Sequence, residues 1–474
     1  MEKYDVMVIG GGSAGLTVAS GAASLGARVA LIEQSGRLGG DCLHFGCVPS
    51  KAFIQAAKEV SIAREAASFG FDVSGAVDMS AVKKRVEEAV ASIQQHDDPE
   101  GFTKLGVDIY FGRAEFVTPN ALLIEGEDYV YGKSIVIATG SSPLIPDIPG
   151  LEDVSYHTNE SVFDLEQLPE KAIFIGGGPI SLELAQALSR LGSDVTVVEK
   201  ASSILSKEDR DIQEVAVEVL QEDVRIVTDA DIQKVTKDGN GLSLHCTVDG
   251  KDLHINGDML FVGTGRKPNS EALNVDKAGV ETDQKGFIPA GDDLRTNVSH
   301  IFSIGDVNGR YFFTHAAGME GKQVVQNAVF GLKGKVNYDQ LPWVTYTSPE
   351  IFHAGMTEEE AKESGIKYKV YQTTLDEVDR FVADHQTRGL VKILTDWKGK
   401  ILGAHAVGEG AGDWMQPVLY AMAKNNGIGS LSNMTYPYPN HAAAVQQTAD
   451  LFWREKLFDG PVPAVTKKLI EYKR

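Results

Sequence analysis

The chain has 474 residues, 43% of them hydrophobic, and carries a formal net charge of −21. This acidity disfavours nucleic acid or an anionic membrane as a partner, because both select a basic surface. The three cysteines exclude a secreted disulfide framework, and the absence of a signal peptide or a long apolar run favours a cytoplasmic protein.

An internal repeat is the strongest feature of the sequence. In each copy an apolar strand leads into a glycine-rich turn, a helix follows, and the next strand ends in a glutamate. The turns begin at Gly10 and Gly176, and the acids are Glu33 and Glu199, 23 residues after the first glycine in both copies. The helices are expected to end near residues 27 and 191.

The first copy has the context that a dinucleotide-binding motif requires. Gly10 and Gly12 let the backbone approach a pyrophosphate, and Gly15 lets the helix pack closely on the strand. The helix N-terminus at Ser13 and Ala14 supplies amide groups to phosphate. Glu33 would accept hydrogen bonds from a ribose.

The second copy has Gly176 and Gly178, with Ser181 where a glycine or alanine is usual. A carboxylate at Glu199 suits a free ribose 2′-hydroxyl and repels a 2′-phosphate. We therefore expect NAD(H) to be preferred over NADP(H), although Lys200 follows directly and weakens the preference.

Each copy closes with a further strand, over 134–140 and 259–265. Between 242 and 248 apolar residues alternate, as in a half-buried strand, and Asp249-Gly250 predicts a hairpin turn. From about Thr345 no glycine motif recurs, and strand-like stretches such as 389–394 alternate with helical ones such as 414–424. This part predicts a separate α+β domain.

The two nearby cysteines, Cys42 and Cys47, carry the chemistry. Five residues of regular helix would separate their Cα atoms by about 7.5 Å, beyond the usual disulfide span. We expect an irregular loop with its bend at Gly46, and Pro49 in the first turn of a helix that starts at Cys47 and stabilises a thiolate there. Metal binding is the competing interpretation of this cysteine pair, but a structural zinc site needs four ligands. Cys246 lies on the apolar face of its strand and is expected to be core.

The run Gly39-Gly40-Asp41-Cys42 to Cys47-Val48-Pro49-Ser50-Lys51 resembles the class I pyridine nucleotide–disulfide oxidoreductases, the family of dihydrolipoyl dehydrogenase, glutathione reductase and mercuric reductase. The resemblance covers essentially the whole chain. It is carried further by the stretches 138–141, 265–269, 304–306 and 345–350.

The resemblance implies a role for each matching residue. Cys42 would meet the substrate, Cys47 would face the flavin, and Lys51 would lie near it with Glu183 as its counter-charge. The implied FAD-binding residues are Gly10, Gly12, Ser13, Ala14, Gly15, Glu33, Gly40, Lys51, Thr139, Gly140, Ser141, Asp306 and Ala316. The implied NAD-binding residues are Gly176, Gly178, Glu183, Glu199 and Gly265. No resident metal site is expected.

The sequence departs from the family at the acid–base catalyst, a histidine that thiol-using members supply from the partner subunit. Tyr436 stands at the histidine position and His441 at the position of the glutamate that orients it. A tyrosine has a pKa of about 10 and a histidine about 6.5, so dithiol substrates are disfavoured. A tyrosine at this position resembles the sequence of mercuric reductase. Mercuric reductases, however, have a further cysteine pair near the C-terminus that delivers the metal, and no cysteine follows Cys246 here.

The predicted fold is α/β, with an FAD domain over 1–148 and 271–342, an NAD(P) domain over 149–270 and a dimerisation domain over 343–474. The resemblance implies a homodimer in which NADH reduces FAD, and FAD reduces the Cys42–Cys47 disulfide. The acceptor would be a disulfide, a metal ion or another small oxidant. The alternatives are a dihydrolipoyl dehydrogenase and a redox-sensing or complex-bound flavoprotein without turnover.

Overall fold

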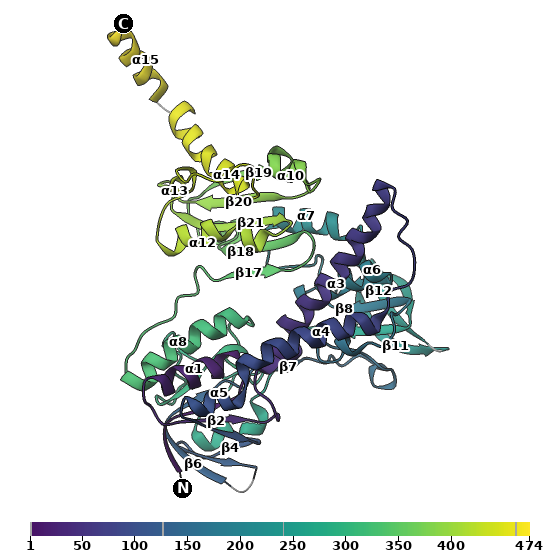
Figure 1. Cartoon of the computed structure of the whole chain (residues 1–474), viewed down its shortest axis with the longest axis vertical. Helices are drawn as coiled ribbons and strands as arrows, with labels where there is room; N and C mark the ends of the chain where they lie inside the picture. Colours follow the sequence, from purple (N-terminus) through teal and green to yellow (C-terminus); the bar gives the residue numbers. More distant parts are fainter. Residues whose placement is uncertain (1, 126–127, 240, 460–461) are drawn as a thin grey trace. The chain divides into compact units, whose positions relative to one another are not determined.

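The computed structural model describes residues 2–125, 128–239, 241–459 and 462–474. The chain forms two compact units, each built from separate stretches of sequence. Unit 1 comprises Met1–Gly176, Ala187–Asp194 and Ala230–Asn337, and unit 2 comprises Gly177–Gln186, Val195–Asp229 and Tyr338–Arg474. Strands and helices alternate in both units, which confirms the α/β class (Figure 1). The domain boundaries after 148, 270 and 342 stay predictions.

Unit 1 contains a seven-stranded sheet. Its strands are β1 (Glu2–Ile9), β2 (Val29–Glu33), β3 (Val107–Phe111), β4 (Ala114–Thr118), β5 (Ala121–Ile124), β6 (Asp128–Ile137) and β16 (Ile301–Ser303). The order is β3-β2-β1-β6-β5-β4, and β16 pairs with β6 in parallel. Because β16 lies far beyond the second glycine turn in sequence, the chain returns to this sheet after an inserted stretch.

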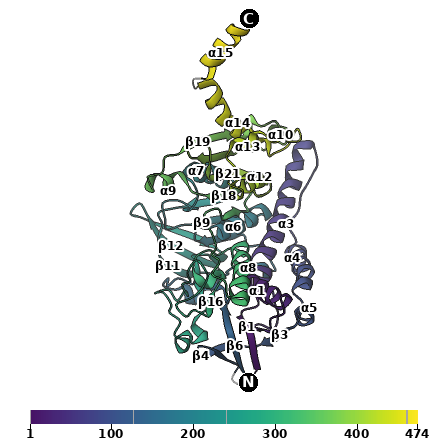
Figure 2. The ribbon, with the colours of Figure 1, turned by 90° about the vertical axis from the view of Figure 1, so that its left-hand side faces the viewer.

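Helices α1 (Ser13–Ser24) and α8 (Thr314–Phe330) pack side by side in unit 1 (Figures 1 and 2). A Cβ atom on Gly321 of α8 would lie 2.9 Å from the Thr17 side chain, so only glycine permits this approach. Their apolar faces share one core with β1 and β2. The remaining helices of this region are α2 (Gly40–His44), α3 (Cys47–Glu65), α4 (Met79–Gln94) and α5 (Pro99–Lys104).

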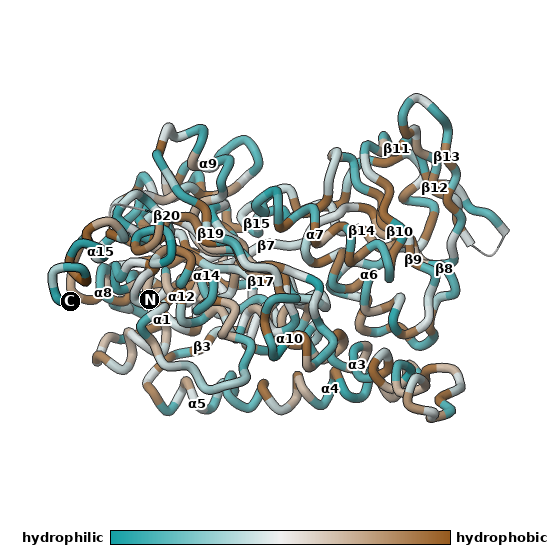
Figure 3. Tube along the Cα trace, turned by 90° about the horizontal axis from the view of Figure 1, so that it is seen from above, coloured by the Kyte–Doolittle hydropathy of each residue, from teal (hydrophilic) through white to brown (hydrophobic). Residues whose placement is uncertain are grey.

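Unit 1 also holds β8 (Lys171–Ile175), which pairs in parallel with β14 (Met259–Val262). All four residues of β14 are buried, and Figure 3 shows the hydrophobic colour on this strand. An antiparallel sheet of β11 (Asp231–Asp238), β12 (Gly241–Val248) and β13 (Lys251–Gly257) adjoins them in sequence. Asp249 and Gly250 both have positive φ between β12 and β13, which confirms the predicted hairpin turn. Cys246 is buried on β12, as expected for core packing.

Unit 2 begins within the second copy of the repeat, directly after its first strand. Helix α6 (Pro179–Leu191) starts in it, β9 (Asp194–Val198) pairs in parallel with β10 (Arg225–Val227), and α7 (Arg210–Leu220) connects these two strands. The repeat predicted from the sequence is therefore a repeat of structure.

The rest of unit 2 is an antiparallel sheet covered by short helices. The strands are β17 (Pro342–Thr345), β18 (Glu350–Gly355), β19 (Lys369–Thr374), β20 (Leu390–Thr395) and β21 (Ile401–Gly408), in the order β17-β18-β21-β20-β19. The helices are α9 (Glu358–Glu363), α10 (Asp379–Ala383), α11 (Ala411–Trp414), α12 (Gln416–Ala423), α13 (Gly429–Ser432), α14 (Ala443–Arg454) and α15 (Val462–Lys473). The helical stretch predicted over 414–424 is confirmed by α12, which begins at Gln416 with Pro417 in its first turn, while Trp414 ends the preceding α11.

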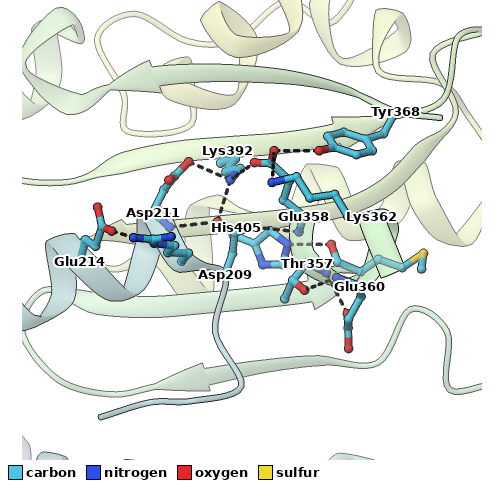
Figure 4. A network of polar contacts seen from close by, with 12 residues as sticks. Asp209, Asp211, Glu214, Thr357, Glu358, Glu360, Lys362, Tyr368, Lys392 and His405 are labelled. Atoms are coloured by element: carbon cyan, nitrogen blue, oxygen red, sulfur yellow. Dashed lines mark hydrogen bonds and ion pairs between the residues drawn. The ribbon is translucent and has the colours of Figure 1, made fainter. Parts of the chain in front are cut away.

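A buried lysine joins two parts of unit 2 (Figure 4). Nζ of Lys392, on β20, lies 2.7 Å from a carboxylate oxygen of each of Asp209, Asp211 and Glu358. Asp209 is also the N-cap of α7, and Glu358 begins α9. The lysine therefore fixes the start of α7 against the antiparallel sheet.

Within the described ranges, no helix has both the length and the apolar character needed to cross a bilayer.

Candidate redox site and nucleotide turns

The two neighbouring cysteines lie on consecutive helices of unit 1. Cys42 is on α2, and α3 begins at Cys47, as Pro49 predicted. The expected loop is wrong in extent, because the helical path is interrupted only at Phe45 and Gly46. A Cβ atom on Gly46 would lie 3.2 Å from Cα of Cys42, so the glycine lets the two cysteines approach each other. Both are free thiols.

The surroundings of Cys47 favour its thiolate. A hydrogen bond from the Cys42 thiol, a second from Thr314 and the positive charge of Lys51 lower the pKa of Cys47 to about 6 against the opposing effect of burial. Oγ1 of Thr314 lies 3.2 Å from Sγ of Cys47. The hydrogen bond to Cys47 and burial raise the pKa of Cys42. One thiol of the pair is thus poised to ionise and the other to donate a proton.

Sequence reasoning missed Thr314. It lies 267 residues from Cys47 and begins α8, where no motif marks a side chain for the dithiol. A hydroxyl at the start of a helix would ordinarily be assigned to capping. Only the packing of α8 against α1 brings it to the cysteines.

Lys51 and Glu183 lie in different units. Lys51 is one turn after Cys47 on α3. Glu183 is buried on α6 between the buried Leu182 and Leu184, and it accepts a hydrogen bond of 2.8 Å from the backbone N–H of Tyr346. The burial agrees with the expectation from the flanking leucines, and the pairing of Glu183 with Lys51 stays a prediction.

The first glycine turn is closely packed where the motif demands it and open where a ligand would lie. A Cβ atom on Gly10 would lie 2.3 Å from the Ala138 carbonyl oxygen, and one on Gly15 would lie 1.9 Å from the Gly10 carbonyl oxygen. A Cβ atom on Gly12 would have Cα of Gly40 as its nearest neighbour, at the ordinary contact distance of 3.7 Å. This turn therefore meets α2, which carries Cys42.

The two copies of the repeat use their glutamates in the same way. Glu33 accepts hydrogen bonds from the N–H groups of Gly11 at 2.6 Å and Ser35 at 2.7 Å. Glu199 accepts them from Gly177 at 2.6 Å and Ala201 at 2.7 Å. Each carboxylate holds its glycine turn to the chain beyond the strand. Because a carboxylate oxygen has two lone pairs, each can also accept from a ribose hydroxyl.

The first turn fits an FAD nucleotide. Helix α1 starts at Ser13 and Ala14 without a side-chain cap, so its first amides are available to an anion. Among the described residues, Oγ1 of Thr139 is buried without a hydrogen-bond partner. A Cβ atom on Gly140 would meet nothing within 4 Å, which leaves open space beside that hydroxyl. Ala316 is buried on α8.

Asp306 belongs to a charged cluster that reaches the dithiol. It accepts a hydrogen bond of 2.5 Å from Ser141, and Nε of Arg266 donates to the same hydroxyl at 2.6 Å. Arg266 also lies 3.2 Å from Asp41, the residue before Cys42. Burial raises the pKa of Asp306. Sequence reasoning placed Arg266 only in a closing motif and missed its link to Asp41.

The second turn repeats the packing of the first. Gly176 has φ +104°, and a Cβ atom there would lie 2.5 Å from the Gly263 carbonyl oxygen, while one on Gly178 would meet nothing within 4 Å. Ser181 is fully buried, so a small residue does serve the close packing expected of that position. Gly265 has φ +141° and leads into β15 (Arg266–Pro268), which pairs with β7 (Ser141–Pro143).

Tyr436 and His441 lie in unit 2, before α14. Oη of Tyr436 points to the sulfur of Met434 at 3.7 Å, and burial raises the pKa of Tyr436. Nε2 of His441 lies 2.9 Å from Oδ2 of Asp384, and its ring packs on Phe381 with a centroid separation of 4.6 Å. Sequence reasoning missed Asp384, which gives His441 a carboxylate partner.

The family profile for pyridine nucleotide-disulphide oxidoreductases matches residues 4–321, and the profile of their dimerisation domain matches residues 341–449. A mercuric reductase from Bacillus cereus is 36% identical over 438 residues, covering 92% of this chain and 69% of that protein. A dihydrolipoyl dehydrogenase from Trypanosoma brucei brucei is 34% identical, covering 94% of this chain and 96% of that protein.

A solved structure extends the likeness to three dimensions. The copper(II) complex of the HOCl-induced flavoprotein disulfide reductase RclA from Escherichia coli has a TM-score of 0.85 and 27% identity, and the match covers 95% of this chain and all of that one. Profile, relatives and fold agree over nearly the whole sequence. The chain therefore belongs to the pyridine nucleotide-disulphide oxidoreductase family and is an FAD-dependent disulfide oxidoreductase.

Proposed function

We propose that this enzyme passes electrons from NADH through Cys42 and Cys47 to a thiophilic metal ion, mercury(II) or copper(II). The observation that carries the proposal is the dithiol itself, with the pKa of Cys47 lowered to about 6. Soft thiolate ligands select such ions, and an ionised pair needs no general base to bind them. The likeness to mercuric reductases and to the copper(II) complex of RclA supports this acceptor.

The electron balance sets the stoichiometry. When bound, FAD supplies the chemistry that moves the two electrons of a nicotinamide hydride to the cysteine pair. Cys42 and Cys47 change from a disulfide to a dithiol, and binding of a mercury(II) ion releases both thiol protons. Two electrons then give mercury(0) and restore the disulfide. The net change is one NADH and one mercury(II) ion to NAD⁺, one proton and mercury(0); copper(II) would require two ions for each NADH.

The roles of the surrounding residues follow the family pattern. We expect Cys42 to contact the metal and Cys47 to face the flavin, and we expect Lys51 to lie near the flavin with Glu183 as its counter-charge. Gly12, Ser13 and Ala14 would hold the FAD phosphates. Support comes from the uncapped start of α1 and from the open space at Gly12 and Gly140.

NADH rather than NADPH is the proposed donor. Glu199 places a carboxylate at the end of β9, where the 2′-phosphate of NADPH would meet like charge. The enzyme is further proposed to act as a homodimer in the cytoplasm. The dimerisation-domain match supports the first proposal, and a cysteine pair used for redox exchange rather than as a permanent cross-link supports the second.

A dihydrolipoyl dehydrogenase activity is the second candidate. The pair of His441 and Asp384, 2.9 Å apart, favours it because such a pair can move the protons that dithiol oxidation releases. The relatives with that activity also cover nearly the whole chain.

One pair of assays separates the two candidates. Purified, FAD-loaded enzyme is tested for NADH oxidation driven by mercury(II) or copper(II), and separately for NAD⁺ reduction by dihydrolipoamide. We expect metal-driven turnover that falls by about a hundredfold or more in Cys42→Ser and Cys47→Ser. Cys246→Ala, which changes the distant buried cysteine, is the control and keeps the rate. Fast reduction by dihydrolipoamide without metal-driven turnover would establish the second candidate instead.

A further inference from the structure

Helix α15 has an apolar face that no other described part of the chain covers. All residues described from Val462 to Lys473 are exposed. Four apolar or aromatic residues recur at intervals of three, four and three positions along this helix: Val462, Val465, Leu469 and Tyr472. Together they form the α15 seam. Their exposed fractions are 39%, 62%, 52% and 91%. In Figures 1 and 2 the helix lies apart from the sheet of β17 to β21.

A helix of this length needs a partner. An isolated helix of about twelve residues is marginal in water, because nucleation is costly and most helical stability comes from packing an apolar face. The α15 seam is narrow, with a three-four repeat, and this is the pattern by which a helix packs against protein. The occupant of the seam is therefore expected to be a protein surface.

The positive charge of α15 indicates which kind of protein surface it binds. Residues 462–474 include four basic residues and one acidic residue, whereas the whole chain has a net charge of −21. Lys468 and Lys473 flank the seam, where charges decide partner choice. Two α15 seams face to face would bring lysine against lysine. An acidic surface on another copy of this chain complements them, and an anionic bilayer would repel the rest of the molecule.

Position in the chain points to the same partner. The dimerisation-domain match ends at residue 449, within α14, and α15 follows shortly after it. We infer that α15 docks through its seam on an acidic surface of a second copy and so extends the dimer interface. This inference rests on the proposed homodimer and is independent of which acceptor the cysteines reduce.

The test uses the full-length, FAD-loaded protein in sedimentation velocity over a dilution series. Val465→Ser/Leu469→Ser removes the middle of the seam, and Lys468→Glu/Lys473→Glu reverses the flanking charge. Each is expected to raise the dimer dissociation constant by about tenfold or more. Ile470→Ser makes a matched apolar change away from the seam and is expected to leave the constant within about twofold.

A second measurement keeps the test decisive if the dimer is too tight to dissociate. Hydrogen exchange of the amides in 462–473 is expected to be slower by about tenfold or more in the wild-type dimer than in the seam variant. Equal exchange together with an unchanged dissociation constant would overturn the inference. So would pelleting with phosphatidylglycerol vesicles that depends on Val465 and Leu469 while dimerisation is unaffected.

Discussion

Cys47 illustrates how single contacts set reactivity at the residue scale. Its low pKa rests first on a hydrogen bond from Cys42, then on Thr314 and Lys51, and burial opposes all three. A thiolate at the start of a helix also gains from the helix dipole. The consequence is that a large fraction of Cys47 is ionised near neutral pH, while Cys42 keeps its proton.

The contribution of Thr314 can be measured directly. In the reduced wild type we expect alkylation of Cys47 by iodoacetamide to follow a pKa of about 6. Thr314→Ala removes a donor to the thiolate and should raise that pKa by about one pH unit, since a hydrogen bond to a charged group is worth about 1.5–3 kcal/mol. Thr314→Ser keeps the hydroxyl and should leave the profile unchanged. Identical profiles for the alanine and serine variants would show that the hydroxyl has no such role.

Glu33 and Glu199 offer a reciprocal pair of variants. Glutamine presents one oxygen to two backbone N–H groups, so one of them loses its partner, at a cost of about 1–3 kcal/mol. Glu33→Gln should weaken FAD retention by about tenfold or more and leave the KM for NADH unchanged. Glu199→Gln should raise the KM for NADH by a similar factor with full FAD content. FAD content by absorbance and KM by NADH oxidation give the two readouts, and a loss of FAD in both variants would contradict the assignment.

At the scale of elements, the buried cation on β20 decides how α7 and α9 are held. Lys392 is 1% exposed and satisfies three carboxylates, one of them the fully buried Asp209. Lys392→Met would leave these charges uncompensated and should lower the free energy of local unfolding by about 3–5 kcal/mol. Native-state hydrogen exchange of the β20 amides measures this loss. Lys335→Met, which removes an exposed ion pair with Asp292, should cost less than about 1 kcal/mol.

The same contact predicts an acid-sensitive step. The ion pair with Lys392 lowers the pKa of Glu358 from 4.5 to about 2 in the folded state. The stability that Glu358 contributes is therefore complete above about pH 4.5 and is lost as the pH falls towards 2. The difference in unfolding free energy between wild type and Glu358→Gln should shrink over this range. A constant difference from pH 5 to pH 2.5 in urea unfolding would contradict the prediction.

At the scale of the whole molecule, FAD is a structural component as well as the redox group. Among the described residues the buried hydroxyl of Thr139 has no hydrogen-bond partner and no side chain caps α1, so we expect FAD to stabilise the folded state by linkage. FAD at a hundredfold excess over its Kd adds about 2.7 kcal/mol, and removing it should lower the Tm by roughly 3 °C. Adding FAD back should restore the Tm. Riboflavin, which lacks the pyrophosphate, should not, and equal rescue by both would argue against a role for the glycine turn.

The sequence by itself determined the pattern of the fold and predicted Cys42 and Cys47 as the redox pair. The spacing from Gly10 to Glu33 and from Gly176 to Glu199 predicted both nucleotide turns, because a tight turn and a close helix leave room for few residue types. Pro49 predicted the start of α3, and the alternation in 242–248 predicted β12 and the burial of Cys246. These signals are local, and local backbone chemistry is written directly in the sequence.

Tertiary structure decided which distant side chains act on those local motifs. Thr314 reaches Cys47, Arg266 reaches Asp41, and Asp384 reaches His441 only because separate elements pack together. The glutamates were expected to accept hydrogen bonds from a ribose, and the structure shows that each accepts one from the backbone of its glycine turn. The sequence has no signal for such contacts, since a hydroxyl or carboxylate far along the chain looks the same whether it faces solvent or a partner. The pKa of Cys47 therefore depends on Cys42 and Lys51, which belong to its own motif, and on Thr314, which only the packing of helices supplies.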